Sequence, residues 1–316
     1  MLHLEQSAAA CYSGFMANPG DSPKTIITHD GKFHADDVFA VATLLLILRR
    51  ESPSVSIVRS RDSALVARAD FVIDVGGQYN EEKNRFDHHQ IGGAGERKNG
   101  IPFAAFGLVW KKFGEALAGS LAVAALVDET VVTPIDADDS GVGLYAPKIL
   151  KLSPYEISDA VHSFTPTWLE KGLDADVAFK EAVAFASRII EREIIRARAV
   201  VEGRERVEAA YAIAQDKRLI VLPEDYSWKD TLARFSEPLY VIHPHHGTWS
   251  LLCVRDNPHL FANRKDLPAP WAGLRDEELA KVTGVSDALF CHRNRFIAIA
   301  KTREGAIELA QQALAN

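Results

Sequence analysis

The chain has 316 residues, which is long for one hydrophobic core, so two domains are expected. Hydrophobic residues make up 47% of it and charged residues 25%, as in ordinary soluble globular proteins. The net charge of −7 argues against a protein coated in positive charge for duplex DNA, although a local basic groove is compatible with that value.

The cysteines and the start of the chain bear on its compartment. Cys11, Cys253 and Cys291 are far apart and odd in number, which is typical of free thiols in a reducing compartment and excludes a paired CxxC zinc site. No apolar run reaches the roughly 18 residues that a membrane span requires. The N-terminus lacks the basic start and apolar core of a signal peptide. We therefore predict a flexible extension over residues 1–22 and a cytoplasmic protein without membrane contact.

From residue 24 the chain alternates between strand-like and helix-like segments. Strands are predicted at KTIIT (24–28), VSIVRS (55–60) and DFVIDVGG (70–77), and helices at residues 36–50 and 62–69. Such alternation indicates a mostly parallel sheet with helices on its faces. Ligands of these sheets gather at the carboxyl ends of the strands, where the polar segment THDGKFHADD (28–37) and Asp74 fall.

The second half has a different pattern. The chain turns helical after Ile101, and residues 174–213 predict one long amphipathic helix. From Arg218 five strand-like runs precede a closing helix, which indicates a smaller α/β or α+β domain. We predict an α/β protein with a first domain over residues 23–150, a helical connector over 151–215 and a second domain over 216–316.

Histidines and carboxylates follow the predicted strands of the first domain. His29, His34 and Asp36 come directly after the first strand, where a loop can turn several side chains toward one point, as metal ligation requires. Asp36 is equally suited to capping the helix that follows. Asp74 ends a predicted strand and is followed by two glycines after Val75. A carboxylate at this position can serve as a ligand in an open crevice, or it can be a simple turn residue.

Two further motifs extend this set. RFDHHQ (85–90) contributes Asp87, His88 and His89. On an extended backbone adjacent side chains point to opposite sides, so we predict that one histidine ligates a metal while the other reaches substrate or a supporting group. PIDADDSG (134–141) contributes Asp136 and Asp139, which would otherwise form an acidic surface turn.

Together these motifs offer imidazole and carboxylate ligands without cysteine. Such mixed sets suit pairs of Mn²⁺ or Mg²⁺, and sometimes Zn²⁺. Two metals about 3.5–4 Å apart can hold the attacking water and the leaving oxygen of an in-line phosphoryl displacement. The residues therefore favour metal-assisted hydrolysis, with a phosphate ester as the substrate.

The order of the motifs resembles motifs one to four of the DHH phosphoesterase superfamily. More closely, the chain is similar to the melanocyte proliferating gene one family, whose members are often labelled metal-dependent protein hydrolases. The similarity continues through FTPTWLE (164–170), PHLFANR (258–264), PAPWAGLRDEEL (268–279) and KTREGAIELA (301–310). It covers nearly everything from Lys24 to the C-terminus.

The resemblance implies roles for the motif residues. The metal ligands would be His29, His34, Asp36, Asp74, His88 and Asp136, with Asp139 close enough to take the place of Asp136. Asp74 would bridge the two metals and His88 would ligate the second. His89 would lie near the scissile phosphate, and Asp87 would orient a neighbouring histidine. The superfamily usually has aspartate where this chain has His34, which leaves the preferred metal open.

The second domain resembles the substrate-holding domain of these enzymes. Many superfamily members carry a Gly-Gly-His motif there, but this chain has FIAIAKTREG instead. The substrate-binding candidates are His259, Arg264, Arg275, His292 and Arg303, each of which could equally serve as structural or surface charge. Trp271 could stack on a base or anchor the core. The histidines of HPHHGT (243–248) lie in this domain and are not expected to bind metal.

The resulting hypothesis is a two-metal phosphoesterase with Mn²⁺ as its main cofactor and Mg²⁺ or Zn²⁺ as alternatives. The resemblance favours an exonuclease of RNA processing, acting on RNA or short single-stranded nucleic acid. A phosphohydrolase of pyrophosphate or dinucleotides and a metal-binding protein without turnover remain alternatives. A peptide hydrolase has no HExxH signature to support it. The cleavage polarity and the oligomeric state, a homodimer included, are left open.

Overall fold

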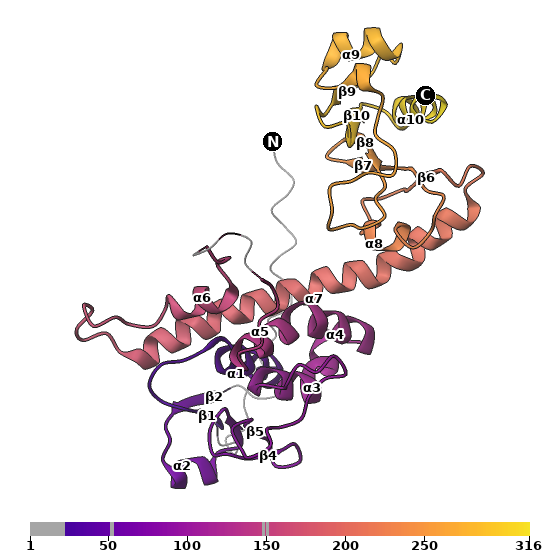
Figure 1. The fold of residues 1–316 in the computed structure, drawn as a ribbon. Coiled ribbons are helices and arrows are strands. Elements are labelled where there is room, and N and C mark those ends of the chain that lie inside the picture. The colour runs from indigo at the N-terminus through magenta and orange to yellow at the C-terminus, as the bar shows by residue number, and fades with distance from the viewer. Residues whose placement is uncertain (1–22, 51–53, 147–148, 150–151) are drawn as a thin grey trace, which may run out of the picture. The chain divides into compact units, whose positions relative to one another are not determined.

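The computed structural model describes residues 23–50, 54–146, 149 and 152–316. The predicted extension over residues 1–22, with Cys11, lies outside these ranges. The α/β prediction is confirmed, because each of two compact units contains a mixed five-stranded sheet flanked by helices (Figure 1). The division between the units falls at Ile194 and Ile195, inside the long helix α7 (Ala175–Ile213).

The sheet of the first unit has the strand order β2-β1-β3-β5-β4. Its strands are β1 (Lys24–Thr28), β2 (Val55–Arg59), β3 (Phe71–Ile73), β4 (Tyr79–Asn80) and β5 (Arg85–Phe86). Only β4 runs antiparallel to its neighbour, so the sheet is mostly parallel as the alternating sequence predicts. The carboxyl ends of β1 and β3 lie side by side, which brings the residues after them together.

Most helices of the first unit follow the sequence pattern closely. They are α1 (Ala35–Leu48), α2 (Ser63–Arg68), α3 (Ala105–Ala118), α4 (Leu121–Val127), α5 (Thr133–Asp139) and α6 (Ile157–His162). A π-helical turn, Asp128–Val132, joins α4 to α5. Such turns insert an extra residue into a helix and often occur at functional sites.

Helix α1 forms the centre of the first unit. Every residue of α1 except Leu46 is buried, because it packs against the sheet and against α3. The Phe39 ring lies 5.4 Å from the Phe106 ring of α3, and both side chains are fully buried. The first turn of α1 carries Asp36 and Asp37, so this apolar helix presents its acidic end to the carboxyl edge of the sheet.

The second unit has its own sheet, in the order β6-β7-β8-β10-β9. Its strands are β6 (Leu219–Val221), β7 (Tyr240–His245), β8 (Thr248–Cys253), β9 (Ala288–Cys291) and β10 (Ile297–Ala300). Its helices are α8 (Lys229–Leu232), a 3-10 turn (Ala269–Trp271), α9 (Asp276–Thr283) and α10 (Arg303–Ala315). In the described part of the chain, no helix has both the length and the apolar character needed to cross a bilayer.

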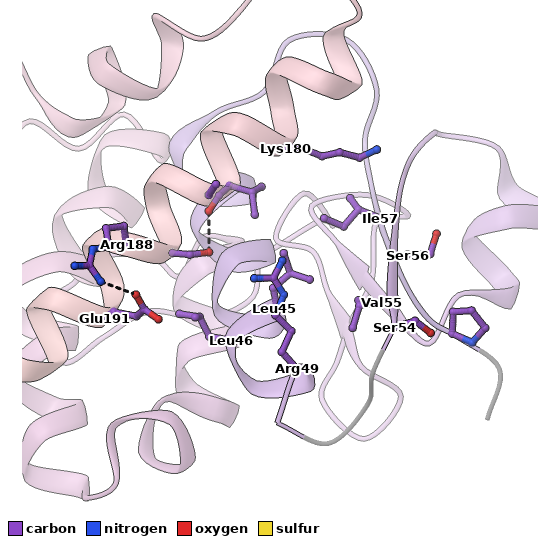
Figure 2. A pocket seen from close by; sticks show the side chains of 14 residues that line it. Leu45, Leu46, Arg49, Ser54, Val55, Ser56, Ile57, Lys180, Arg188 and Glu191 are labelled. Atoms are coloured by element: carbon purple, nitrogen blue, oxygen red, sulfur yellow. Dashed lines mark hydrogen bonds and ion pairs between the residues drawn. The ribbon is translucent and has the colours of Figure 1, made fainter. Parts of the chain in front are cut away.

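A cavity of about 860 Å³ lies beside β2 in the first unit (Figure 2). Its walls come from β2, from the C-terminal end of α1 and from α7. The basic residues that line it are Arg49 at the end of α1 and Lys180 and Arg188 of α7. It lies at the end of α1 that carries no acidic residue, and none of its lining residues belongs to the histidine and aspartate motifs. This cavity is therefore separate from the residues that the sequence singles out.

Removing the ring at the centre of the first unit should be costly. We expect Phe106→Ala to lower the free energy of unfolding by about 3–5 kcal/mol, because it leaves a cavity between α1 and α3. Trp168→Ala is the matched control, since that side chain is 83% exposed and its loss should change stability by less than about 0.5 kcal/mol. Urea unfolding followed by circular dichroism compares the two, and equal shifts would contradict the packing described here.

Candidate metal centre

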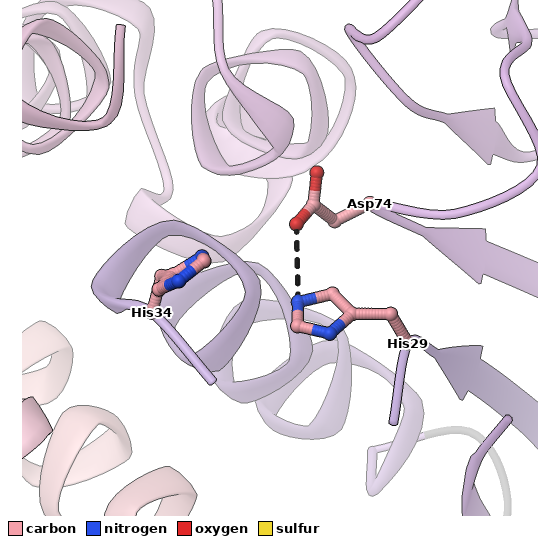
Figure 3. Close-up of side chains that lie close together, drawn as sticks. All are labelled: His29, His34 and Asp74. Atoms are coloured by element: carbon pink, nitrogen blue, oxygen red, sulfur yellow. Dashed lines mark ion pairs between the residues drawn. The ribbon is translucent and has the colours of Figure 1, made fainter. Parts of the chain in front are cut away.

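Three motifs converge at the carboxyl edge of the first sheet. His29 follows β1, Asp74 follows β3, and His34 immediately precedes α1. Figure 3 shows the His29 ring directed at the carboxylate of Asp74, with His34 beside them at the start of the helix. The parallel pairing of β1 with β3 thus brings residues that are 45 positions apart into one site, as the strand rule predicts.

The backbone at Asp74 is bent sharply. Asp74 has a φ of 53°, in the left-handed region that side chains other than glycine seldom adopt. Its N–H donates to the carbonyl of Phe86 on the neighbouring strand at 3.0 Å, which holds this bend in place. Gly76 and Gly77 continue the turn with φ values of 92° and 64°, where glycine has no steric penalty.

The Asp74 carboxylate is shared by three imidazoles. Its Oδ2 lies 3.4 Å from His29 Nε2, whereas its Oδ1 lies 3.2 Å from His88 Nε2 and 3.3 Å from His89 Nδ1. Burial alone would raise the pKa of Asp74, but the three histidines hold its pKa below the ordinary range. Each oxygen therefore faces a different part of the site, which is the arrangement that a bridging ligand needs.

The two adjacent histidines lie on the same side, so the prediction that they point apart is wrong. Their ring centroids are 4.3 Å apart and both rings approach Asp74. Strand β5 ends at Phe86, so the alternation of an extended strand no longer applies at positions 88 and 89. The histidines differ instead in exposure, because the His88 side chain is 14% exposed and that of His89 is 63% exposed.

Asp87 orients His89. Its Oδ1 accepts the backbone N–H of His89 at 3.0 Å and lies 2.9 Å from His89 Nδ1, while its Oδ2 accepts the N–H of Gly77 at 2.6 Å. The pKa of His89 is raised to about 9, first by its interaction with Asp74 and then, against the effect of burial, by Asp87. Asp87 thus engages Nδ1 of a ring whose side chain is largely exposed.

The sequence left open whether Asp36 caps α1 or ligates a metal, and the contacts of Asp36 and Asp37 decide this. The carboxylate that caps α1 belongs to Asp37, whose Oδ1 accepts the N–H of His34 at 2.9 Å, so Asp36 is not the cap. Asp37 Oδ2 also lies 3.3 Å from His29 Nε2, a contact that the sequence did not indicate. Burial raises the pKa of Asp37 to about 7 and that of Asp36 well above its ordinary range.

Several buried polar atoms of this site lack a well-aligned hydrogen bond, although some lie close to an oppositely charged group. Both carboxylate oxygens of Asp36, Asp37 Oδ2, Asp74 Oδ1 and His88 Nε2 are buried and make no aligned hydrogen bond to any described residue. Buried charges without partners are costly, and a cation that all of them face would remove that cost. The donor set therefore fits divalent metal ions.

Three groups of ligand atoms are close enough together to hold a metal ion. They are His29 with His34 and Asp74; Asp74 with His88 and His89; and His34 with Asp36 and Asp139. Within each group the atoms lie within 4.8 Å of one another. The groups share Asp74 and His34, so they form one connected site rather than three separate ones.

Asp139 belongs to this site, whereas Asp136 does not. Asp139 Oδ2 lies 3.2 Å from His88 Nε2. The fully buried Asp136 is instead bound by Arg97 Nη1 at 2.7 Å and by the N–H of Gly107 at 2.9 Å. Two residues of the same helix thus face different partners, and Arg97 is the residue that sequence reasoning missed.

A cavity of about 310 Å³, called here the His34 cavity, opens at one side of the site. Its lining includes His34, Asp36, Asp138, Asp139, Ser158 and His162. The His162 ring of α6 lies 5.8 Å from the His34 ring. No motif pointed to α6, because a single histidine at a helix end carries no ligand spacing of its own.

Comparison with known proteins supplies the family. The family model MYG1_exonuc, described as Uncharacterised protein family (UPF0160), matches residues 25–314. The chain belongs to this family. It is 32% identical to the MYG1 exonuclease of Homo sapiens, over 93% of this chain and 87% of that protein. It is 31% identical to the MYG1 exonuclease of Rattus norvegicus, over 93% of this chain and 86% of that protein. It is also 31% identical to the MYG1 protein of Dictyostelium discoideum, over 93% of this chain and 97% of that protein. The resemblance inferred from the motifs is thereby confirmed.

The five substrate-binding candidates all lie in the second unit. Arg264 is held by Asp256 at 2.6 Å and by the carbonyls of Pro238 and Ala233, and its side chain is 7% exposed. The other four make fewer contacts. Arg275 lies over the Phe290 ring, and Arg303 is 3.8 Å from Glu304. His292 accepts the N–H of Asn294, and His259 is exposed. Arg264 thus has a structural task, and substrate binding by the other four stays a prediction.

Two other features of the second unit are structural as well. Trp271 is 3% exposed and packs in the core formed by the sheet and α10, so it anchors a loop rather than presenting a stacking face. In HPHHGT, His243 and His245 each lie near Asp225, at 3.3 and 3.2 Å. These residues do not form a metal-ligating group among the described parts of the chain.

Asp139 and Asp136 can be separated by one pair of variants. We expect Asp139→Asn to weaken Mn²⁺ binding at least about tenfold while changing stability little. Asp136→Asn should leave Mn²⁺ affinity within about threefold of the unchanged protein and lower the free energy of unfolding by about 3 kcal/mol, because it breaks a buried ion pair. Calorimetric titration and urea unfolding measure the two effects, and the reverse pattern would return Asp136 to the ligand set.

Proposed function

We propose that this chain is a divalent-metal-dependent phosphoesterase, an exonuclease that hydrolyses phosphodiester bonds of RNA or short single-stranded nucleic acid. Its relatives from Homo sapiens and Rattus norvegicus are named MYG1 exonucleases. The observation that carries the proposal is the buried Asp74 carboxylate, whose two oxygens face separate histidines within one connected set of ligands. This arrangement supports two adjacent cations around one substrate.

The roles of the residues follow from their contacts. His29, His34, Asp36, Asp74, His88 and Asp139 would hold the metal ions, which when bound supply an acidified water and charge to offset the phosphate. His29 Nδ1 lies 2.9 Å from the carbonyl of Asp30, so its Nε2 is left to ligate. His89, held by Asp87 and open to solvent, would donate to a nonbridging oxygen of the scissile phosphate.

Hydrolysis should depend on the metal and on its shared ligands. We expect metal-stripped protein to cut labelled RNA or DNA oligomers only after a divalent metal, Mn²⁺ above all, is added back. Asp74→Ala and His88→Ala should each lower kcat at least about a hundredfold, because each removes a ligand needed for the two-metal arrangement. His246→Ala is the matched control, an exposed histidine of the second unit that should keep full activity.

The substrates in the same assay decide between related functions. Dinucleotides and pyrophosphate are included, so that a preference for either would replace the exonuclease proposal by a small-molecule phosphohydrolase. Mn²⁺ that raises the melting temperature without any hydrolysis would favour a binding protein. Activity that survives in both Asp74→Ala and His88→Ala would overturn the assignment of this site.

His34 sets the metal preference in this proposal. Imidazole favours Zn²⁺ more strongly than carboxylate does, while carboxylates suit Mn²⁺ and Mg²⁺. We expect His34→Asp to raise the affinity for Mn²⁺ relative to Zn²⁺ about tenfold in competition titrations. His162→Asp, which changes a neighbouring residue outside the ligand groups, is the control and should shift that ratio much less. An equal shift in both variants would mean that local charge, not ligation, sets the preference.

The cytoplasmic location stays a prediction. It rests on the spacing and odd number of the cysteines. Cys253 and Cys291 are free thiols buried in the core of the second unit, which agrees with a reducing environment.

A further inference from the structure

A second cavity adjoins the metal centre. It measures about 420 Å³ and shares Asp138 and Ser158 with the His34 cavity. It is called here the Tyr145 cavity, after the one aromatic residue among its described lining. Its volume falls within the range of roughly 300–1,000 Å³ typical of small-molecule sites. A space large enough for a further group of a ligand therefore lies next to the His34 cavity.

One part of the Tyr145 cavity is apolar and exposed. Pro134, Val142, Leu144 and Ile157 line it beside Tyr145. Leu144 is 52% exposed and Tyr145 is 46% exposed, which is a high exposure for side chains of this size next to a site. An aromatic face and aliphatic neighbours offer a surface on which any nucleobase can stack.

The remaining part of the Tyr145 cavity is acidic. Asp138 and Glu156 line the cavity, and no Lys, Arg or His is present among its described lining residues. Tyr145 itself interacts with both of these carboxylates. Ionised carboxylates accept hydrogen bonds and donate none, so they suit the hydroxyl groups of a sugar. They repel a phosphate, because like charges at short range raise the energy of the complex.

We infer that the Tyr145 cavity binds the terminal nucleoside of a nucleic acid strand whose scissile phosphate lies at the metal centre. The base would lie against Tyr145, and the free hydroxyl of the strand end would donate to Asp138 or Glu156. A strand that continued through the cavity would bring its next phosphate against these carboxylates. The cavity would thus select strand ends, which rests on the phosphoesterase function proposed above and gives it a structural reason for exonucleolytic action.

Steady-state kinetics of the full chain with Mn²⁺ tests the stacking surface. The substrate is a diadenylate with free hydroxyl groups at both ends. We expect Tyr145→Ala to raise KM about tenfold, because base stacking on an aromatic ring is lost. Tyr145→Phe keeps the aromatic ring, so its KM should equal that of the unsubstituted protein. Tyr155→Ala is the matched control, since Tyr155 is 74% exposed nearby and does not line the cavity.

End phosphates test the acidic part. The same diadenylate is prepared with an added phosphate at the 5′ end or at the 3′ end. We expect one of the two phosphorylated forms to be cut at least about tenfold less efficiently, as judged by kcat/KM. Glu156→Gln should reduce that penalty severalfold, because it removes one negative charge from the cavity. The form that suffers the penalty also identifies which end of the strand occupies the cavity.

The outcomes separate this inference from the proposed function. Equal cleavage of all three diadenylates, or equal KM values for Tyr145→Ala and Tyr155→Ala, would overturn the nucleoside site. Bis(p-nitrophenyl) phosphate serves as the simple diester in the same series. If the protein hydrolyses it with Mn²⁺ while showing no preference for strand ends, only the inference fails. If Mn²⁺ supports hydrolysis of no diester at all, the proposed function fails and the inference falls with it.

Discussion

The Asp74 carboxylate is buried among three histidines, and the rest of the site is arranged around this charge. Its left-handed backbone places it between β1 and β5, where His29 reaches one oxygen and His88 the other. The glycines that continue the bend deliver the N–H of Gly77 to Asp87, which in turn holds His89. One sharp turn after a three-residue strand therefore positions both the shared Asp74 carboxylate and the exposed His89 ring.

The acidic content of the site is what suits it to cations. Asp36, Asp37, Asp74 and Asp139 lie close together, and the pKa of Asp36 and of Asp37 is raised because both are buried from solvent and adjoin other carboxylates. A fully ionised set would be unstable without positive charge nearby. The histidines supply part of that charge only when protonated, whereas bound metals would supply it at any pH at which the ligands are deprotonated. The fold thus concentrates negative charge at the acidic end of the otherwise apolar α1.

Much of this site was predictable from the sequence, because the first three motifs each lie at the end of a strand of the parallel sheet. THDGKFHADD overlaps the end of β1, and Asp74 and the two histidines of RFDHHQ follow β3 and β5. These three strands are parallel neighbours in the sheet, so the convergence of the motifs follows from the parallel sheet. The choice between Asp136 and Asp139 was not predictable. They lie three residues apart after a π-helical turn, and Asp136 is bound by Arg97 and Gly107, which are distant in the sequence. Likewise, the end of β5 at Phe86 decides how His88 and His89 point, and a two-residue strand leaves little trace in sequence.

The second unit shows the structure of FIAIAKTREG, the segment in which the resemblance to the DHH phosphoesterases would lead us to expect a Gly-Gly-His motif. The corresponding FIAIA segment forms β10, in which Ala298 and Ala300 are fully buried while Ile297 and Ile299 are partly buried. The loop that follows is fixed by Asp287, which accepts from the N–H and the hydroxyl of Thr302. The strand part of this segment serves packing and the loop after it forms a turn, so Arg303, at the start of α10, is the substrate-binding candidate that remains in it. In the proposed function, recognition of the end of a nucleic acid falls largely to residues outside β10, and the Tyr145 cavity offers such residues within the unit that contains the histidine and aspartate groups.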